Sequence, residues 1–136
     1  MNRSIATAIV LLAGMPSLAM ADCSSTTRVT GAALNALING NTVCANRGAE
    51  KWQGQHRAGG QLWDYKMGPG HPIDPSKQVG TWNIARNFVT YCYTGDKCYS
   101  YSVHGPFAGN TYNFCFANGK LEVSGATFKN GEQGCP

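Results

Sequence analysis

The chain has 136 residues, of which 43% are hydrophobic and 13% charged, and its formal net charge is +4. This composition excludes an intrinsically disordered chain and a coiled coil, since both need many more charges. The length predicts one domain around one hydrophobic core. Because the basic residues stand singly and never form a cluster, nucleic-acid binding is not expected.

The first segment, residues 1–21, has the pattern of a secretory signal peptide. Its apolar run Ile5–Gly14 has the length of a signal-peptide core, about half of the roughly 20 apolar residues in a membrane span. Small residues before Asp22 predict cleavage at that point. We therefore expect an exported protein of a Gram-negative bacterium, periplasmic or secreted. Its single disulfide-containing domain would cover residues 22–136 and have no membrane span.

One short helix is predicted next, within residues 28–40. Thr30 can cap its start and Gly40 can end it. The apolar residues of this segment recur at helical spacing, which predicts one buried stripe along the helix. The stripe consists of Ala33, Leu34, Leu37 and Ile38.

After the helix, apolar and polar residues alternate, which predicts strands joined by short turns. The segment Gly68–Gln78 holds three prolines and is expected to be a loop, because proline cannot donate to a sheet ladder. The expected strands are Asn41–Ala45, Glu50–Arg57, Gln61–Met67, Val79–Ala85, Phe88–Tyr93, Lys97–Val103, Thr111–Ala117 and Lys120–Phe128.

No helix-length segment separates these strands, so the fold is expected to be all-β, an antiparallel meander. Closure into a small lipocalin-like barrel would remove the exposed edges and is preferred over a sandwich. One side of each strand is mostly apolar or aromatic, which predicts one buried face. This face is expected to carry Trp63, Tyr65, Met67, Trp82, Ile84, Val89, Tyr91, Tyr93, Tyr99, Tyr101, Val103, Tyr112, Phe114, Phe116, Leu121 and Val123.

The six cysteines all follow the predicted cleavage site and indicate up to three disulfides. A zinc site is disfavoured because no two cysteines have C-x2-C spacing, and we expect no cofactor. The strand alternation turns Cys92 and Cys98 outward and opposite each other, within disulfide range. We therefore expect a Cys92–Cys98 bond, with Cys98–Cys115 as the alternative. Sequence proximity alone suggests Cys23–Cys44 and Cys115–Cys135.

The aromatic residues of the expected inner face are the most informative functional pattern. Plain core packing would explain them, but tyrosine and tryptophan can also stack on and hydrogen-bond a small ligand at a barrel mouth. The chain has no nucleophile elbow, phosphate-binding loop or dinucleotide fingerprint. The leading hypothesis is non-catalytic binding of a small apolar or aromatic molecule or a periplasmic protein. The candidate ligand-binding residues are Trp52, His56, Trp63, Tyr65, Trp82, Tyr91 and Tyr101.

Two further functions remain open. The proline-rich loop Gly68–Gln78 would lose little entropy on docking, as a periplasmic inhibitor of a lysozyme-type enzyme requires. Alternatively, His56 could serve as an acid–base group with Asp64 on the neighbouring strand, in a small hydrolase or isomerase. A surface hydrogen bond is the simpler interpretation of that pair.

Four short motifs follow one another between about residue 30 and residue 117. They are Leu37-Ile38-Asn39-Gly40-Asn41-Thr42, Gly80-Thr81-Trp82 with Ile84, the Cys92…Cys98-Tyr99 hairpin and Tyr112-Asn113-Phe114. In this order the chain resembles a family of small exported proteins, mostly from alphaproteobacteria, that carry a domain of unknown function. The resemblance implies a lipocalin-like small β domain and no established reaction. The Gly-Thr-Trp triplet is also similar to one on the first strand of lipocalins and avidins.

Overall fold

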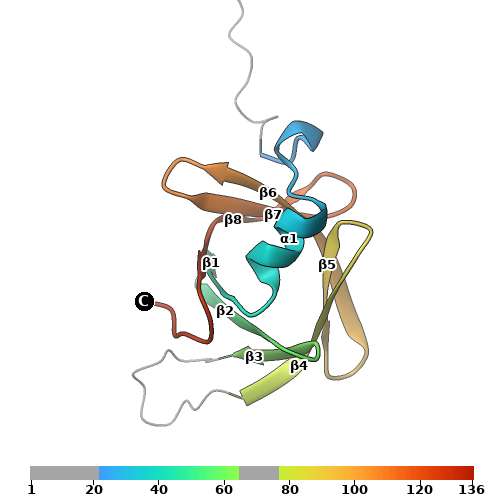
Figure 1. Ribbon diagram of the computed structural model, residues 1–136, viewed down its shortest axis with the longest axis vertical. Coiled ribbons are helices and arrows are strands. Elements are labelled where there is room, and N and C mark those ends of the chain that lie inside the picture. Colours follow the sequence, from blue (N-terminus) through green and yellow to red (C-terminus); the bar gives the residue numbers. More distant parts are fainter. Residues whose placement is uncertain (1–21, 65–76) are drawn as a thin grey trace, which may run out of the picture.

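The computed structural model describes residues 22–64 and 77–136, which form a closed antiparallel β-barrel (Figure 1). Each of the eight strands in these residues pairs with the next one along the chain, and β8 closes the barrel on β1. The elements are η2 (Ser25–Thr27, a 3-10 helix), α1 (Gly31–Ile38), β1 (Thr42–Arg47), β2 (Glu50–Arg57), β3 (Gln61–Asp64), β4 (Lys77–Ala85), β5 (Phe88–Tyr93), β6 (Lys97–Phe107), β7 (Thr111–Cys115) and β8 (Leu121–Lys129). The lipocalin-like all-β barrel expected from the alternation is confirmed.

Several strand boundaries differ from expectation: β1 runs to Arg47, β7 ends at Cys115, and β8 covers Leu121–Lys129. At β4 and β6 the difference arises because pairing continues past local irregularities. Strand β6 runs to Phe107, beyond the expected end at Val103, because its pairing with β7 resumes after a register shift. Strand β4 begins at Lys77, so the last two residues of the expected proline-rich loop are part of a strand. The other residues of that loop between 68 and 76 lie outside the described residues.

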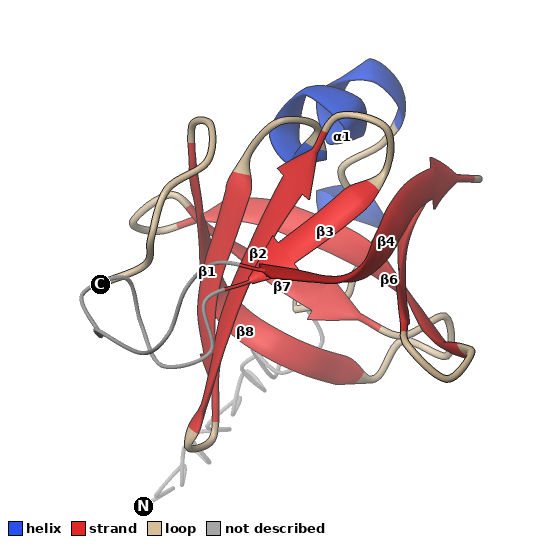
Figure 2. Cartoon of the chain, turned by 90° about the horizontal axis from the view of Figure 1, so that it is seen from below, coloured by secondary structure: helices blue, strands red, loops and turns tan. Residues whose placement is uncertain are grey.

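Helix α1 lies across one end of the barrel, as Figures 1 and 2 show. It inserts Leu34 and Ile38, both fully buried, into the core. Thr30 occupies the N-cap position but makes no side-chain cap bond, contrary to expectation. Instead, the Gly31 amide donates to the side-chain oxygen of Asn87 in the β4–β5 turn, at 2.9 Å. A neighbouring turn therefore caps the helix and fastens it to the barrel.

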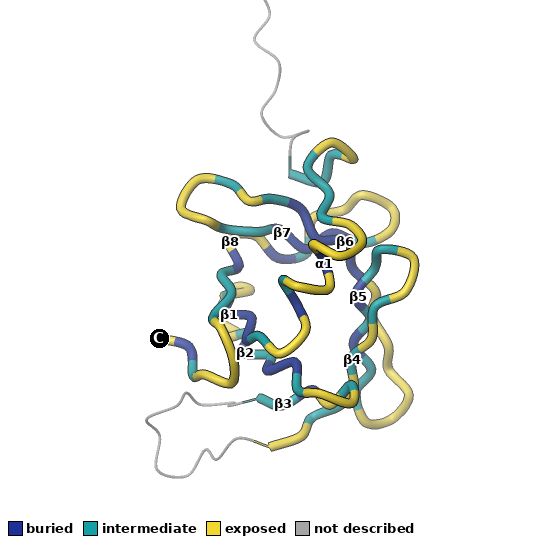
Figure 3. Tube along the Cα trace, in the orientation of Figure 1, coloured by how far each residue is buried: buried dark blue, intermediate teal, exposed yellow. Residues whose placement is uncertain are grey.

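The inner face of the barrel is packed with aromatic and aliphatic side chains. The ring of Trp52 makes edge contacts with the rings of Tyr91, Tyr101 and Phe114, at centroid distances of 5.8, 5.8 and 5.1 Å. Exposed residues gather in the turns between strands (Figure 3). The buried core consists of Leu34, Ile38, Val43, Leu62, Val89, Tyr91, Tyr101, Val103, Phe114, Val123 and Ala126.

Strand β3 shows that the expected inner face was wrong at Trp63. Its neighbour Leu62 is 3% exposed and fills the inner position, whereas the Trp63 ring lies under the Arg57 guanidinium at 3.9 Å. The indole N–H donates to the Gln61 side chain at 3.1 Å. Ring size misled the prediction, because a tryptophan stacked on an arginine can cover the outer surface of a sheet.

Further expectations about the inner face have different outcomes. Tyr99 is 43% exposed instead of buried, because it lies near the start of β6 at the end of the barrel. Leu121 is 37% exposed instead of buried, because the β7–β8 register shifts between Phe114 and Cys115 and breaks the alternation there. Tyr65 and Met67 lie outside the described residues.

The disulfide pattern confirms one expected bond and corrects the other two. Cys92 and Cys98 are directly opposed on β5 and β6 and are bonded, with their Cα atoms 4.0 Å apart. The remaining bonds are Cys23–Cys115 and Cys44–Cys135, so the pairs suggested by proximity and the Cys98–Cys115 alternative are wrong. Closure of β8 on β1 brings Cys44 close to Cys135, 91 positions away. The segment before α1 lies against β6 through the Arg28–His104 bridge, which places Cys23 near Cys115, 92 positions away.

Three disulfides indicate folding in an oxidising compartment outside the cytoplasm. Among the described helices, none is long and apolar enough to cross a membrane.

Candidate functional site

The end of the barrel opposite α1 holds a pocket lined by aromatic and charged side chains, which we call the barrel mouth. Strands β1 and β5 end there and strands β2 and β6 begin there. The pocket has a volume of about 240 Å³. Its lining residues are Arg47, Glu50, Trp52, Tyr93, Tyr99, Tyr101, Phe116 and Glu122.

Strand alternation places these rings at successive depths. Tyr99 and Tyr101 are two residues apart on β6 and face the same side, but their exposed fractions are 43% and 4%. The buried ring of Tyr101 lies 5.1 Å from Phe116 and 5.8 Å from Trp52, between centroids. Tyr99 contacts Tyr93 at 6.3 Å nearer the rim. The mouth therefore has a packed aromatic floor and a partly exposed aromatic wall.

An ion-pair cluster lies at the rim of the mouth. The Arg47 guanidinium donates to Glu122 at 2.6 Å and to Glu50 at 2.7 Å. The hydrogen bonds that Arg47 donates to Glu50 and Glu122 raise the pKa of its guanidinium. Burial, followed by the charge of Glu122, raises the pKa of Tyr101 to about 12. Burial also raises the pKa of Tyr93. Both tyrosines therefore stay protonated at neutral pH.

A second hollow adjoins the mouth and shares three of its residues. It has a volume of about 500 Å³. The common wall is formed by Glu50, Trp52 and Tyr93, and the indole of Trp52 hydrogen-bonds the Tyr93 side chain. The other lining residues are Lys51, Asp64, Lys77, Gln78, Val79 and Thr94. The hollow thus extends the mouth along the ends of β3 and β4.

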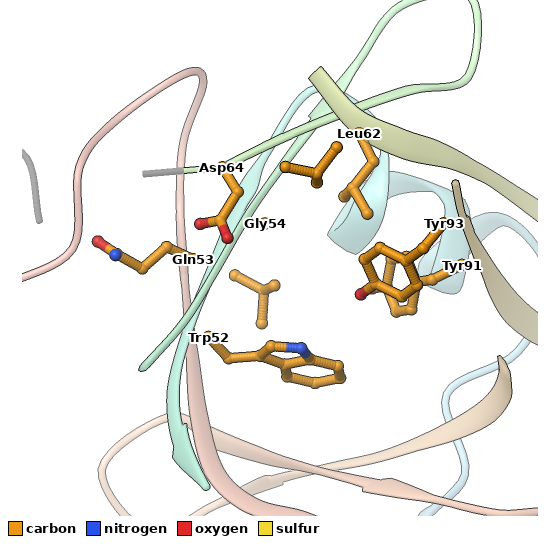
Figure 4. Close-up of a pocket in the computed structure, with 9 residues that line it drawn as sticks. Trp52, Gln53, Gly54, Leu62, Asp64, Tyr91 and Tyr93 are labelled. Atoms are coloured by element: carbon orange, nitrogen blue, oxygen red, sulfur yellow. The ribbon is translucent and has the colours of Figure 1, made fainter. Parts of the chain in front are cut away.

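Deeper in the barrel, the space between the side chains is small. A cavity of about 20 Å³ lies among inward-facing residues of β1 to β5, with the rings of Trp52, Tyr91 and Tyr93 around it (Figure 4). That volume holds roughly one water molecule. This cavity cannot take an organic ligand, so a ligand of useful size would bind at the mouth.

His56 lies near the α1 end of the barrel and is 1% exposed. Its Nδ1 is 2.8 Å from the Asn41 carbonyl oxygen, and its Nε2 is 2.8 Å from the Tyr91 hydroxyl. Because a carbonyl only accepts, Nδ1 carries the proton and the Tyr91 hydroxyl donates to Nε2. Burial lowers the pKa of His56 to about 4. The ring is therefore neutral and engaged at both nitrogens.

The acid–base pair suggested by the sequence is not assembled. On the paired strands, His56 is opposite Leu62, and Asp64 is opposite Gly54, two residues closer to the mouth. Asp64 lines the hollow beside the mouth. The partners of the His56 ring nitrogens are Asn41 and Tyr91, so the carboxylate is not placed to orient the imidazole.

The expected ligand-binding residues fall into different parts of the molecule. Trp52 and Tyr101 line the mouth, and Tyr91 lies below it in the core. His56 and Trp82 contact each other near the α1 end, with ring centroids 5.5 Å apart. Trp63 is on the outer face, and Tyr65 lies outside the described residues.

Six residues of the mouth were not predicted as site residues: Tyr93, Tyr99, Phe116, Arg47, Glu50 and Glu122. The sequence pattern placed the aromatic three on the inner face only, without distinguishing the mouth from the core. The position of each residue within its strand could have distinguished the mouth from the core, because inward residues next to the turns at one end of a barrel form its rim. Nothing in the local sequence around the three charged residues indicates that they line a site.

A buried Ser–His pair was also missed. Ser102 Oγ lies 2.9 Å from His104 Nε2, and His104 Nδ1 lies 2.8 Å from the Ser24 carbonyl oxygen. The carbonyl again requires a proton on Nδ1, so Nε2 is an acceptor. The hydroxyl proton of Ser102 is shared between His104 Nε2 and the Cys115 carbonyl oxygen, which is 3.3 Å from Oγ. Both side chains are buried, and the Cys23–Cys115 disulfide ties the same N-terminal segment to β7. The pair fastens this segment to the barrel wall.

Comparison of the chain with family models, curated proteins and solved structures gives no match. Within residues 22–64 and 77–136, no group of three or more His, Cys, Asp and Glu side chains could hold a metal ion. Strand pairing and the contents of the mouth define the molecule as a small lipocalin-like barrel with an aromatic opening.

Proposed function

We propose that this is an exported, non-catalytic binding protein, periplasmic or secreted, that holds a small apolar or aromatic molecule at the barrel mouth. The observation that carries the proposal is the lining of the mouth: five aromatic side chains around a pocket of about 240 Å³. Aromatic rings bind planar and apolar groups by stacking, and they dominate the lining of ligand pockets.

The polar groups of the mouth support recognition of a specific molecule. The tyrosine hydroxyls stay protonated and can donate or accept hydrogen bonds. The Arg47 ion pairs join β1, β2 and β8, and the Cys92–Cys98 bond joins β5 and β6 beside the mouth. A wall held in this way loses little entropy when a ligand binds.

Binding can be tested with a library of small aromatic fragments by ligand-observed NMR. We expect a subset of fragments to bind, and Tyr99→Ala to weaken their binding about tenfold, since an aromatic contact at the site would be lost. Trp63→Ala is the matched control, because it removes a partly exposed ring on the outer face. Absence of fragment binding, or equal effects of the two substitutions, would contradict the proposal.

A further inference from the structure

The charges at the barrel mouth do not balance. Two carboxylates, Glu50 and Glu122, share one guanidinium, that of Arg47. Lys51 lies in the neighbouring hollow, and its ammonium group donates a hydrogen bond to the Pro136 carbonyl oxygen at 3.2 Å. The residues that line the mouth therefore carry one more negative than positive charge.

The rings of the mouth offer faces that no lysine or arginine within residues 22–64 and 77–136 covers. Elsewhere, Arg28 lies over Phe88 at 4.3 Å and Arg57 over Trp63 at 3.9 Å. No lysine or arginine in the described part of the chain stacks on a ring of the mouth in this way. Aromatic faces attract cations within roughly 6 Å of the ring centre, and most strongly those with weakly hydrated charge.

From these observations we infer that the ligand of the mouth is a small organic cation of the quaternary ammonium type. The inference rests on the proposed binding function and narrows its ligand to an organic cation, in which the methyl groups are the apolar part. The aromatic wall would enclose the methyl groups, and the carboxylate in excess would balance the charge. At about 240 Å³ the pocket is smaller than the roughly 300–1,000 Å³ of drug-sized sites, which suits a compact head group.

Charge complementarity distinguishes this class from an anion. An anionic ligand would have to draw Arg47 away from carboxylates at 2.6 and 2.7 Å. It would also bring a negative charge towards the electron-rich ring faces. A cation meets neither obstacle, because its positive charge balances the second carboxylate, for which Arg47 alone is not enough.

Isothermal titration calorimetry with choline and its neutral isostere 3,3-dimethyl-1-butanol tests the ligand class. We expect choline to bind at least tenfold more tightly than the isostere. Glu122→Gln should weaken choline binding about tenfold and leave isostere binding unchanged, because only the charge interaction is lost. Glu132→Gln is the control, since Glu132 pairs with Arg57 outside the mouth.

A substitution that strengthens binding excludes a mere loss of folding as the explanation. Arg47→Gln frees both carboxylates and should tighten choline binding severalfold. Phosphocholine distinguishes a free quaternary ammonium ion from the same group carried on a larger molecule. Binding as tight as that of choline indicates a head group on a larger molecule, and weaker binding indicates a free cation.

The inference and the proposed function fail in different ways. If aromatic fragments bind but choline binds no better than its isostere, the cation class is wrong and the binding function stands. The same conclusion follows if Arg47→Gln weakens choline binding. If neither fragments nor choline bind, both proposals are wrong.

Discussion

Single residues in this protein show how burial changes the chemistry that a side chain can perform. His56 is the clearest case, because a histidine beside aromatic and acidic residues in the sequence suggests acid–base chemistry. In the barrel, its Nδ1 binds the Asn41 carbonyl and its Nε2 accepts from Tyr91. The side chain is therefore part of the core and joins the start of β1 to β5.

The burial of His56 predicts a pH-dependent stability. Its pKa is about 4 in the folded protein and about 6.5 in an unfolded chain. Between these values the unfolded state binds the proton more strongly, so lowering the pH from about 6.5 to about 4 should cost about 3 kcal/mol. Urea unfolding at pH 7.0 and pH 4.5 would measure the loss.

His56→Gln provides the comparison for this prediction. The variant keeps an amide that can donate to Asn41 and accept from Tyr91, and it should show a flatter pH dependence. Burial also lowers the pKa of His104. Because His104 is present in both the original protein and the variant, its contribution to the pH dependence cancels in the comparison. Parallel pH profiles for the two proteins would assign the dependence to other groups.

Among the strands, β4 shows why the triplet Gly80-Thr81-Trp82 has a glycine. A Cβ atom at position 80 would lie 2.1 Å from the Cys92 carbonyl oxygen on β5. The register of β3 and β4 shifts between Leu62 and Trp63, so β4 is irregular beside this close approach. Backbone proximity thus explains the glycine without any ligand.

Gly80→Ala should therefore destabilise the barrel by about 3 kcal/mol or more, since the added methyl group must displace the backbone of β5. Thr81→Ala is the matched control on an exposed position of the same strand and should cost less than about 1 kcal/mol. Denaturant unfolding of both variants measures the difference. Similar costs for the two would show that the strands can separate easily at this point.

At the scale of the whole molecule, two long-range disulfides hold the ends of the described domain against the barrel. Cys23–Cys115 joins the segment before α1 to β7, and Cys44–Cys135 joins β1 to the residues after β8. The Cys92–Cys98 bond spans only a hairpin, with a sequence separation of 6. The three bonds should contribute unequally to the free energy of unfolding, because a longer closed loop restricts the unfolded chain more.

Paired Cys→Ala substitutions test this ranking. Loss of either long-range bond should cost about 4–5 kcal/mol and loss of the hairpin bond about 2 kcal/mol, from the loop lengths alone. Guanidinium unfolding under non-reducing conditions gives the three free energies. Peptide mapping of the intact protein should recover the Cys23–Cys115 and Cys44–Cys135 cross-links. A larger loss for the hairpin pair would show that native-state contacts outweigh loop entropy.

Local patterns along the chain were enough to predict the short helix, the strands and their order. They also predicted the Cys92–Cys98 bond, because a three-residue turn sets the register of its hairpin. These features depend on periodicity and on residues close in sequence, which fix a strand's two sides and its nearest partner.

Only the closed barrel decides the rest. The pairing of β1 with β8 brings Cys44 close to Cys135. The pairing of β3 with β2 sets Leu62 opposite the buried His56 and Trp63 opposite Gln55, so that Leu62 is buried while Trp63 covers the outer face. Closure also separates the core rings from those of the mouth, and it brings Arg47 from β1 to Glu122 on β8. Alternation along one strand says which side a residue faces, but its depth in the barrel and its partners across the mouth depend on how all the strands are staggered.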